Sequence, residues 1–258
     1  MFLAIDIGNT TTMIGFFEGS RILGSFRIES SRAGTPDECG ILAHQLLGYH
    51  VGDDKAVGKI GICSVVPPLT QIYVSMAKKY FNTVPLLLDH NSRLDFKILY
   101  DVPEQVGGDR LANAAAARVL YGYPCIIVDL GTATTYDVIN SDGDYAGGLI
   151  SPGLWTSASN LFKKASKLFP VKIEKPDKAI ATDTANSIKS GLYYGFIGQM
   201  EYLVNLIKRN MKAENIKVIA TGGFSDIFTE SDTGVVDHLE PSLTLKGLQI
   251  VFDGGQNV

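Results

Sequence analysis

Two short stretches of the sequence place a carboxylate beside a glycine and a run of hydroxyl or amide side chains. They are Asp6-Ile7-Gly8-Asn9-Thr10-Thr11-Thr12 and Asp129-Leu130-Gly131-Thr132-Ala133-Thr134-Thr135. Backbone N–H groups and threonine hydroxyls donate hydrogen bonds to phosphate oxygens, glycine lets the backbone come close, and a carboxylate can hold Mg²⁺. The combination predicts a site for a metal–triphosphate, although two ordinary hairpins with Asp in their turns would share the pattern.

Apolar, β-branched runs flank both stretches, so each predicts a strand, a tight turn and a second strand. One D-x-G-x-T would be weak support for a phosphate site. Its repetition in matching contexts favours a duplicated unit, with the two carboxylates facing each other across a cleft.

A third acidic residue follows a glycine pair, in Gly107-Gly108-Asp109-Arg110, just before the helix-forming run 111–117. Asp109 could simply cap that helix, because Asp is a favoured capping residue. A glycine pair beside Asp and Arg at a helix N-terminus also makes a site for an anion that holds one base. The two interpretations are compatible.

Composition narrows the class of protein. The 258 residues are 45% hydrophobic and 19% charged, with a net charge of −4, as in a folded globular chain. No basic stripe indicates nucleic-acid or membrane binding, and no apolar run is long enough to span a bilayer. Walker A, G-x-G-x-x-G, G-x-S-x-G and H-E-x-x-H motifs are absent from the sequence, and its four histidines show no paired spacing.

The N-terminus and the cysteines favour a cytoplasmic location. No cationic leader precedes Asp6, so we expect no signal peptide. Three cysteines without a C-x-x-C pair are typical of reduced thiols. We expect Cys63 and Cys125 to be packed inside and Cys39 to be partly exposed.

The order of predicted elements indicates an α/β fold of two ribonuclease-H-like lobes, 1–115 and 116–258, each with a mixed five-stranded sheet. In the first lobe the order is β-β-β-α-β-α-β, with a helix from Thr35 to about Leu47. We expect that helix to bury Ile41, Leu42 and Leu46, and a further strand to cover 84–88. The last helix, near 240–248, is expected to pack back on the first lobe.

In the second lobe, strands are predicted at 125–129, 135–140, 145–150 and 217–220. A long helix is predicted over 188–211, and Gly191, Gly195 and Gly198 interrupt it. Such glycines weaken a helix, so close packing against the other lobe or a second chain is expected. Gly222-Gly223 is a candidate resting place for adenosine.

Taken together, these motifs resemble the type III pantothenate kinase family. The matching motifs, in order, are Asp6-x-Gly8-Asn9-Thr10, Gly107-Gly108-Asp109-Arg110, Asp129-x-Gly131-Thr132, Gly147-Gly148…Pro152-Gly153, Thr184…Ser190-Gly191 and Leu243-Thr244-Leu245-x-Gly247-Leu248. The resemblance covers nearly the whole chain. It implies an actin-like homodimer that uses ATP, Mg²⁺ and K⁺ or NH₄⁺ to phosphorylate pantothenate to 4′-phosphopantothenate, the first committed step toward coenzyme A.

The resemblance also implies roles for individual residues. ATP would be held by Asp6, Ile7, Gly8, Asn9, Thr10, Thr11, Thr12, Met13 and Thr132. Pantothenate would be held by Tyr100, Gly107, Gly108, Asp109, Arg110 and Thr184, with Asp109 as the base. Asp129 would bind the monovalent cation and Asp6 would bind Mg²⁺. Asp183 departs from the family's usual Asn and adds a charge next to an anionic substrate.

Two other functions remain open at this point. One is a different small-molecule kinase of the same fold, although those chains are usually longer. The other is a non-catalytic nucleotide-sensing or transcription-accessory protein, which should have lost Asp6, Asp109 or Asp129. All three carboxylates are present.

Overall fold

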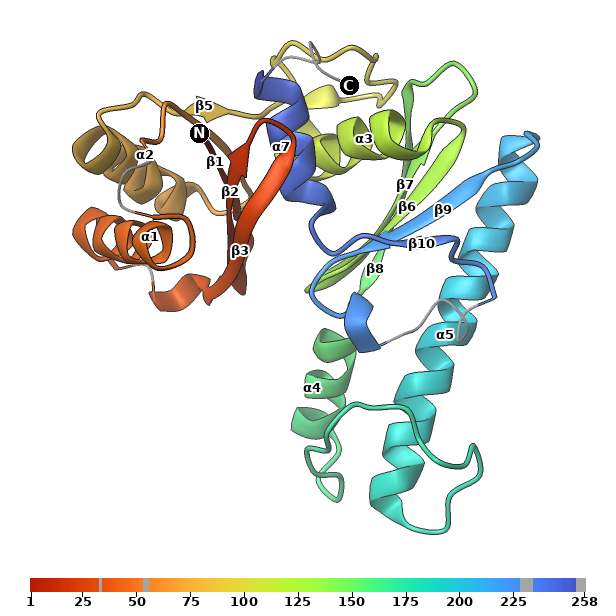
Figure 1. Cartoon of the computed structure of the whole chain (residues 1–258). Coiled ribbons are helices and arrows are strands. Elements are labelled where there is room, and N and C mark those ends of the chain that lie inside the picture. The colour runs from red at the N-terminus through yellow and green to blue at the C-terminus, as the bar shows by residue number, and fades with distance from the viewer. Residues whose placement is uncertain (33, 53–55, 228–233, 254–258) are drawn as a thin grey trace. The chain divides into compact units, whose positions relative to one another are not determined.

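The computed structural model describes residues 1–32, 34–52, 56–227 and 234–253, and its contacts divide the chain into two compact units. Unit 1 comprises 1–120 and 242–258, and unit 2 comprises 121–241 (Figure 1). Each unit is built on one mixed five-stranded sheet. None of the helices in the described ranges combines the length and apolar character that crossing a membrane would need.

The sheet of unit 1 has the order β3-β2-β1-β4-β5. Its strands are β1 (Phe2–Ile7), β2 (Thr11–Glu18), β3 (Arg21–Glu29), β4 (Lys59–Ser64) and β5 (Leu86–Leu87). The first three form an antiparallel meander, whereas β4 runs parallel to β1 and β5 runs parallel to β4. The alternating side chains of β1 therefore face two different layers.

Helices cover both faces of this sheet. On one face, α1 (Pro36–His50) and α2 (Pro67–Phe81) pack over an apolar cluster that includes Leu3, Ile5 and Ile62. On the other, α7 (Leu243–Asp253) contacts β1, β2 and β4. Next to it lies α3 (Gly108–Tyr121), and the Thr244 hydroxyl donates to Asn113 Oδ1 at 2.8 Å. The described residues also form short 3-10 turns at η1 (Ser30–Arg32) and η2 (Pro103–Gln105) in unit 1 and at η3 (Ser225–Ile227) in unit 2.

Unit 2 repeats the arrangement. Its sheet has the order β10-β9-β6-β7-β8, from β6 (Cys125–Leu130), β7 (Ala133–Ile139), β8 (Tyr145–Pro152), β9 (Lys217–Thr221) and β10 (His238–Leu239). Strands β6, β7 and β8 are antiparallel neighbours, and β9 and β10 extend the sheet in parallel. The helices are α4 (Leu154–Lys164) and α5 (Thr184–Met211), and α5 packs on the core through buried residues such as Tyr193 and Met200.

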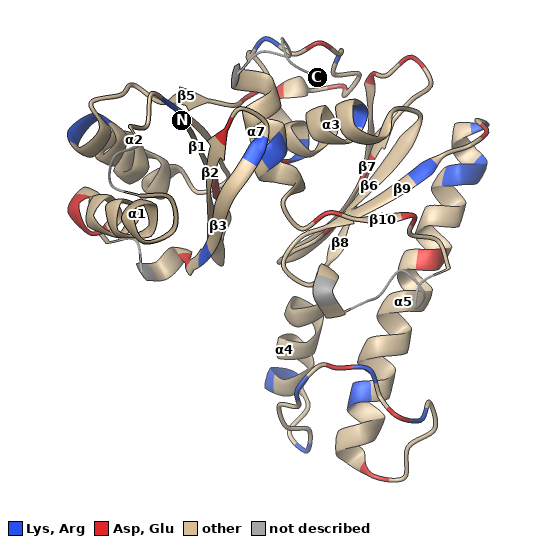
Figure 2. Cartoon of the chain, in the orientation of Figure 1, with Lys and Arg blue, Asp and Glu red and all other residues tan. Residues whose placement is uncertain are grey.

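The predicted fold class, α/β with two mixed five-stranded sheets, is confirmed. In both sheets the strand that ends in the motif aspartate lies centrally, paired with an antiparallel hairpin on one side and a parallel strand on the other. Acidic and basic residues are interspersed over both units (Figure 2).

Some local predictions are wrong. Ile41 is 53% exposed, and α1 is buried instead through Cys39, Gly40, Ala43 and Leu47. The reason is that Gly40 lies directly against the Tyr80 ring of α2, so the two helices approach through small residues. Cys39 is also buried rather than partly exposed.

Three elements differ from their predicted extents. Strand β5 is only two residues long, and β10 was not predicted. Helix α5 begins at Thr184 rather than at 188, because the Asp183 side chain caps it. A Cβ added to Gly191, Gly195 or Gly198 would meet no described atom within 4 Å, so these glycines do not pack against this chain.

Candidate active site

The first motif aspartate is the last but one residue of β1, in a hairpin whose last strand pair is Ile7 with Thr12. This leaves residues 8–11 as the turn, closed by the Gly8 N–H donating to the Thr11 carbonyl at 3.0 Å. Asn9 and Thr10 are exposed at its tip, while the Ile7 and Thr12 side chains are buried. The groups of the motif that are open to a ligand are therefore concentrated in the turn.

Ser30, which follows β3, fixes this turn from behind. Its hydroxyl donates to the Gly8 carbonyl at 2.6 Å and lies 3.0 Å from the Thr12 hydroxyl. Its backbone N–H donates to the Thr10 carbonyl at 2.9 Å. Ser30 and Thr12 are both buried, so the turn is held by hydrogen bonds shielded from water. Met13 continues from it into β2, where its sulfur accepts from Arg27 Nε at 3.3 Å.

Asp109 lies in the first turn of α3, two residues beyond Gly107, which occupies the cap position. Its Oδ1 accepts the backbone N–H of Arg110 at 2.9 Å. Burial raises the pKa of the Asp109 carboxyl, while the N–H and guanidinium of Arg110 oppose this shift. A base with a raised pKa accepts a proton more readily than an ordinary carboxylate.

Glycines shape the turn that carries Asp109. A Cβ on Gly107 would collide with the Asp109 carboxylate, and one on Gly108 would collide with the Leu88 carbonyl oxygen. Arg110 is itself buried, 7% exposed. The sequence Gly107-Gly108 is thus required by close approach rather than by flexibility.

Cys63 of β4 lies between Asp6 of β1 and Asp109 in the first turn of α3. It pairs with Asp6 in the parallel register of β1 and β4, and its thiol donates to Asp6 Oδ1 at 3.2 Å. Burial raises the pKa of the thiol well above its ordinary value, and the charges of Asp6 and Asp109 add to the shift. The thiol is therefore a neutral donor beside Asp6.

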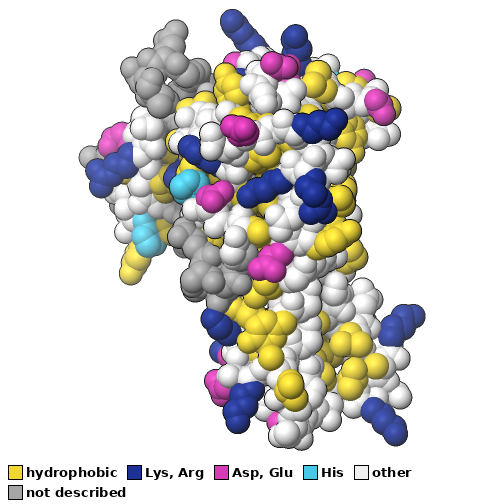
Figure 3. Space-filling view, turned by 90° about the vertical axis from the view of Figure 1, so that its right-hand side faces the viewer, with side chains coloured by type: hydrophobic (Ala, Val, Ile, Leu, Met, Phe, Trp, Pro, Cys, Tyr) yellow, Lys and Arg dark blue, Asp and Glu magenta, His cyan; other side chains and the backbone are white. Residues whose placement is uncertain are grey.

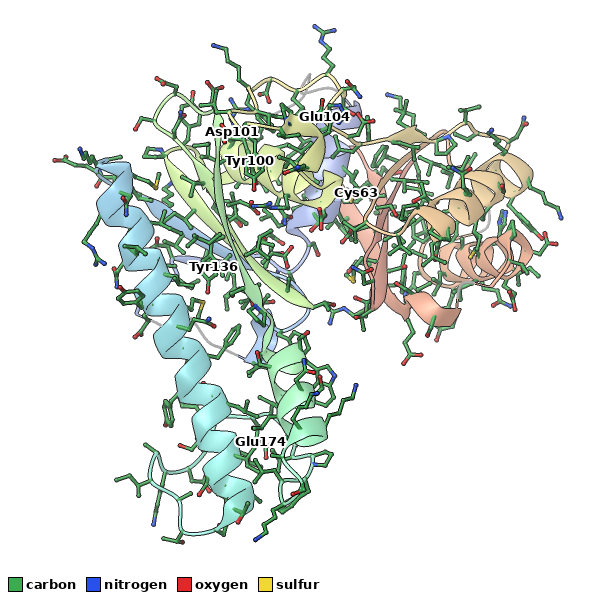
Figure 4. The ribbon with its side chains drawn as sticks, turned by 180° about the vertical axis from the view of Figure 1, so that it is seen from behind. Cys63, Tyr100, Asp101, Glu104, Tyr136 and Glu174 are labelled. Atoms are coloured by element: carbon green, nitrogen blue, oxygen red, sulfur yellow. The ribbon has the colours of Figure 1, made fainter. Side chains whose placement is uncertain are left out.

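The segment before α3 carries the remaining predicted substrate residue of unit 1. Tyr100 is half-buried and lies close to Asp101 and Glu104, which are exposed (Figure 4). Val106 is buried and anchors this segment next to Gly107.

The second motif aspartate ends β6 in a related hairpin. Leu130 pairs with Thr134, so the turn is 131–133, one residue shorter than 8–11. The Gly131 N–H donates to the Ala133 carbonyl at 3.1 Å. Thr132 is exposed, and its carbonyl accepts from the Thr156 hydroxyl at 2.6 Å and from the Gly153 N–H at 3.1 Å.

The glycine turn after β9 lies directly on this hairpin. Asp129 pairs with Thr221 in the register, and the Phe224 N–H donates to the Leu130 carbonyl at 3.1 Å. Gly222 has φ +94°, and a Cβ there would collide with the Asp129 carboxylate and the Leu130 backbone. The structure thus brings the Asp129 hairpin and the Gly222-Gly223 turn together within unit 2.

Thr184 lies elsewhere in unit 2, at the start of α5. It lines a cavity of about 530 Å³ together with Leu168, Ala181, Thr182, Asp183, Ser187 and Ile188. Asp183 Oδ1 accepts the Asn186 backbone N–H at 2.9 Å, and Oδ2 accepts the Asn186 side-chain amide at 2.7 Å. The unusual aspartate is therefore occupied in capping the helix.

Sequence reasoning missed Cys63, Ser30 and the contact of Gly222 with Asp129. For Cys63 a signal existed, because it ends a parallel strand as Asp6 ends its neighbour. Ser30 and Gly222 reach the site because the strands that precede them, β3 and β9, pair with β2 and β6. No local sequence pattern indicates these contacts.

Comparison with known proteins identifies relatives over the whole chain. Residues 2–206 match the family model described as Type III pantothenate kinase. The protein of that name from Halalkalibacterium halodurans is 41% identical over 253 residues, covering 98% of each chain. The protein of that name from Agathobacter rectalis is also 41% identical over 253 residues, covering 98% of this chain and 96% of its own.

Solved structures with this fold are much more distant in sequence. The activator of 2-hydroxyisocaproyl-CoA dehydratase from Clostridium difficile, with bound ADPNP, has a TM-score of 0.56 at 13% identity and covers 98% of this chain and 94% of its own. The ethanolamine utilization protein EutJ from Carboxydothermus hydrogenoformans has a TM-score of 0.55 at 14% identity, with coverage of 96% and 89%. These similarities concern the fold alone.

Proposed function

Because the chain belongs to the type III pantothenate kinase family, we propose that it transfers the γ-phosphoryl group of ATP to pantothenate, forming 4′-phosphopantothenate on the route to coenzyme A. The observation that carries this proposal is 41% identity to a relative of that name over 98% of both chains. The retained Asp6, Asp109 and Asp129 support an active enzyme rather than a regulatory relative.

In this proposal the exposed turn of the first hairpin holds the ATP phosphates. The backbone of Asn9 to Thr11 and the side chains of Asn9 and Thr10 supply donors, and Thr132 supplies a further contact to ATP. Phosphoryl transfer depends mainly on alignment and on neutralising negative charge, which such donors provide.

We assign the general base to Asp109. It accepts the proton of the primary hydroxyl of pantothenate as the oxygen attacks the γ-phosphorus and the bond to the ADP oxygen breaks. The burial that raises its pKa favours this proton transfer. Tyr100, Gly107, Gly108 and Thr184 are the proposed contacts for pantothenate, and Arg110 attracts either its carboxylate or the phosphoryl group in transfer.

The proposed metal ions are Mg²⁺ at Asp6 and K⁺ or NH₄⁺ at Asp129. Within the described ranges, no three His, Cys, Asp or Glu side chains gather into a group able to hold a metal ion. Mg²⁺ often binds through one or two carboxylates with waters and substrate phosphates, so the half-buried Asp6 fits such a role. There it would neutralise phosphate charge.

We further propose that the enzyme is a cytoplasmic homodimer in which α5 supplies part of the interface. Gly191, Gly195 and Gly198 follow one face of the helix, and the same face carries Tyr202, which is 63% exposed. Hydrophobic side chains gather over the lower part of this side of the molecule (Figure 3). A second chain packed there would give the glycines the close contact that this chain does not.

The test is ADP release by the purified protein with ATP, Mg²⁺ and K⁺, with and without pantothenate, and mass analysis of the product. We expect ADP to form only with pantothenate, and sugars or acetate to replace it poorly. Asp109→Asn should lower turnover about 10²- to 10⁴-fold and leave nucleotide binding intact. Asp101→Asn is the matched control, because it changes an exposed carboxylate in the preceding segment. Full turnover in Asp109→Asn would refute the base role, and equal turnover with another alcohol would refute the substrate.

A further inference from the structure

The side chain of Cys63 has a neighbour and an orientation that an ordinary core residue would not need. Ile60 and Ile62 of the same strand belong to the apolar cluster under α1 and α2. Because side chains alternate along a strand, Cys63 faces the opposite layer. That is the face on which Asp6 also lies, one strand away in register.

The thiol is aimed at the carboxylate and is held there. Cys63 is 1% exposed, and its Sγ lies 3.2 Å from Asp6 Oδ1. On its other side, a Cβ placed on Gly108 would come within 3.2 Å of Cys63 Cβ, so the start of α3 packs against the cysteine. The sheet and α3 together leave the side chain little freedom to rotate away from Asp6.

The duplicated sheet supplies an independent comparison. In unit 2 the residue in register with Asp129 is Thr221, also 1% exposed and also a small side chain carrying a donor hydrogen. Both sheets thus place a small buried donor, rather than a purely apolar residue, on the parallel strand next to the motif aspartate. A carboxylate that must point toward a ligand benefits from a donor that fixes one of its oxygens.

We propose that Cys63 is a positioning residue, whose thiol fixes the Asp6 carboxylate in the orientation that binds MgATP. This rests on the proposed function only in assigning Asp6 to the nucleotide. The cysteine itself touches neither substrate and takes no part in a redox step.

The experiment compares Cys63→Ala, Cys63→Ser and Cys125→Ala. Serine keeps a donor, alanine removes it, and Cys125 is a fully buried cysteine of unit 2 that controls for loss of a core thiol. MgATP affinity is measured by calorimetry without pantothenate, and KM, kcat and Mg²⁺ activation are measured with it. Thermal melting reports any general loss of stability.

We expect Cys63→Ala to weaken MgATP binding about five- to tenfold and to raise the Mg²⁺ needed, as loss of one hydrogen bond from a weak thiol donor implies. Cys63→Ser should recover most of the affinity, and Cys125→Ala should bind MgATP as the wild type does. Equal affinity of Cys63→Ala and wild type would overturn the proposal, as would equal losses in the alanine and serine variants. Since this measurement needs no pantothenate, it stands even if pantothenate is not the acceptor.

Discussion

The Asp109 carboxylate accepts the backbone N–H of Arg110 at 2.9 Å, yet burial still raises its pKa above the ordinary carboxyl value. The folded protein therefore binds this proton more tightly than the unfolded chain does. Ionisation of Asp109 consequently lowers the free energy of unfolding as pH rises from the unfolded pKa through the folded one.

Replacing this carboxylate should raise the stability of the protein and lower its activity. Asp109→Asn keeps an acceptor for the Arg110 N–H and removes the buried charge, so we expect a higher melting temperature near neutral pH. The kcat should fall about 10²- to 10⁴-fold with loss of the base. The melting difference should narrow as pH is lowered toward the ordinary carboxyl pKa. A variant that melts below wild type at neutral pH would show that the charge is stabilised by its surroundings.

The second prediction concerns Ser30, whose hydroxyl joins Gly8 and Thr12. Ser30→Ala leaves buried polar groups without their partner, which typically costs about 1–3 kcal/mol of unfolding free energy. The turn should also become less ordered, so KM for ATP should rise more than KM for pantothenate. Ser25→Ala is the control, because Ser25 is exposed on β3. Equal changes in both KM values would contradict a local effect on the nucleotide turn.

A third prediction concerns the close packing of the start of α3 against Leu88, the residue after β5. Gly108→Ala would force a Cβ into the Leu88 carbonyl, and the helix start that carries Asp109 must shift to relieve the collision. We expect a lower kcat and a loss of about 1–3 kcal/mol of stability from overpacking. Gly58→Ala serves as the control, since the nearest atom to its added Cβ is 4.0 Å away. Unchanged turnover in Gly108→Ala would mean that Asp109 need not be held so closely.

The fourth prediction addresses the α5 face. Gly198→Arg places a long charged side chain among the exposed glycines, where this chain offers open space. If the face is a dimer interface, the dimer dissociation constant should rise at least about tenfold, or about 1.4 kcal/mol. Sedimentation measures it, with Gln71→Arg on an exposed position of α2 as the control. An unchanged dimer would place the interface elsewhere.

The duplicated fold was predictable because the hairpins are local. Each motif aspartate is flanked by apolar β-branched runs that pair within a few residues, which fixes strand, turn and strand. The edge strands were harder. The pair His238–Leu239 is too short to show an alternating pattern, and β5 keeps only Leu86–Leu87 of the predicted 84–88. Such strands exist because a neighbour offers hydrogen bonds, not because of their own sequence.

Helix α1 shows why hydrophobicity alone misplaced its buried face. The predicted stripe was Ile41, Leu42 and Leu46. Leu46 does pack against the apolar cluster, but Ile41 is exposed, and the fully buried residues of the helix include Cys39, Ala43 and Leu47. Small residues allow α1 to approach Tyr80 closely, and that choice depends on a partner helix 40 residues away in the chain. Sequence periodicity cannot supply the partner.

The sequence indicated candidate residues for the site but few of the contacts between them. The sequence places Gly107-Gly108 at the start of a helix beside an acid, but it did not indicate the close approach of these glycines to Asp109 and Leu88. To predict that the Cys63 thiol lies next to Asp6 would have required the register of two parallel strands that a long connection separates in the chain. Assignments of Tyr100, Thr132 and Thr184 to substrates stay predictions.

The last prediction concerns Asp183, the residue before the proposed substrate contact Thr184. Its carboxylate caps α5 by accepting the Asn186 N–H, and this hydrogen bond lowers the pKa of Asp183, so the charge persists at neutral pH. Asn caps helices about as well as Asp. Asp183→Asn should therefore leave the melting temperature unchanged, whereas Asp183→Ala should lower it. If the pantothenate carboxylate binds near Thr184, removing the charge should lower KM for pantothenate about twofold, the effect of a screened like charge. A KM that rises instead would mean that the Asp183 carboxylate assists substrate binding, and that the aspartate is a functional feature of this chain.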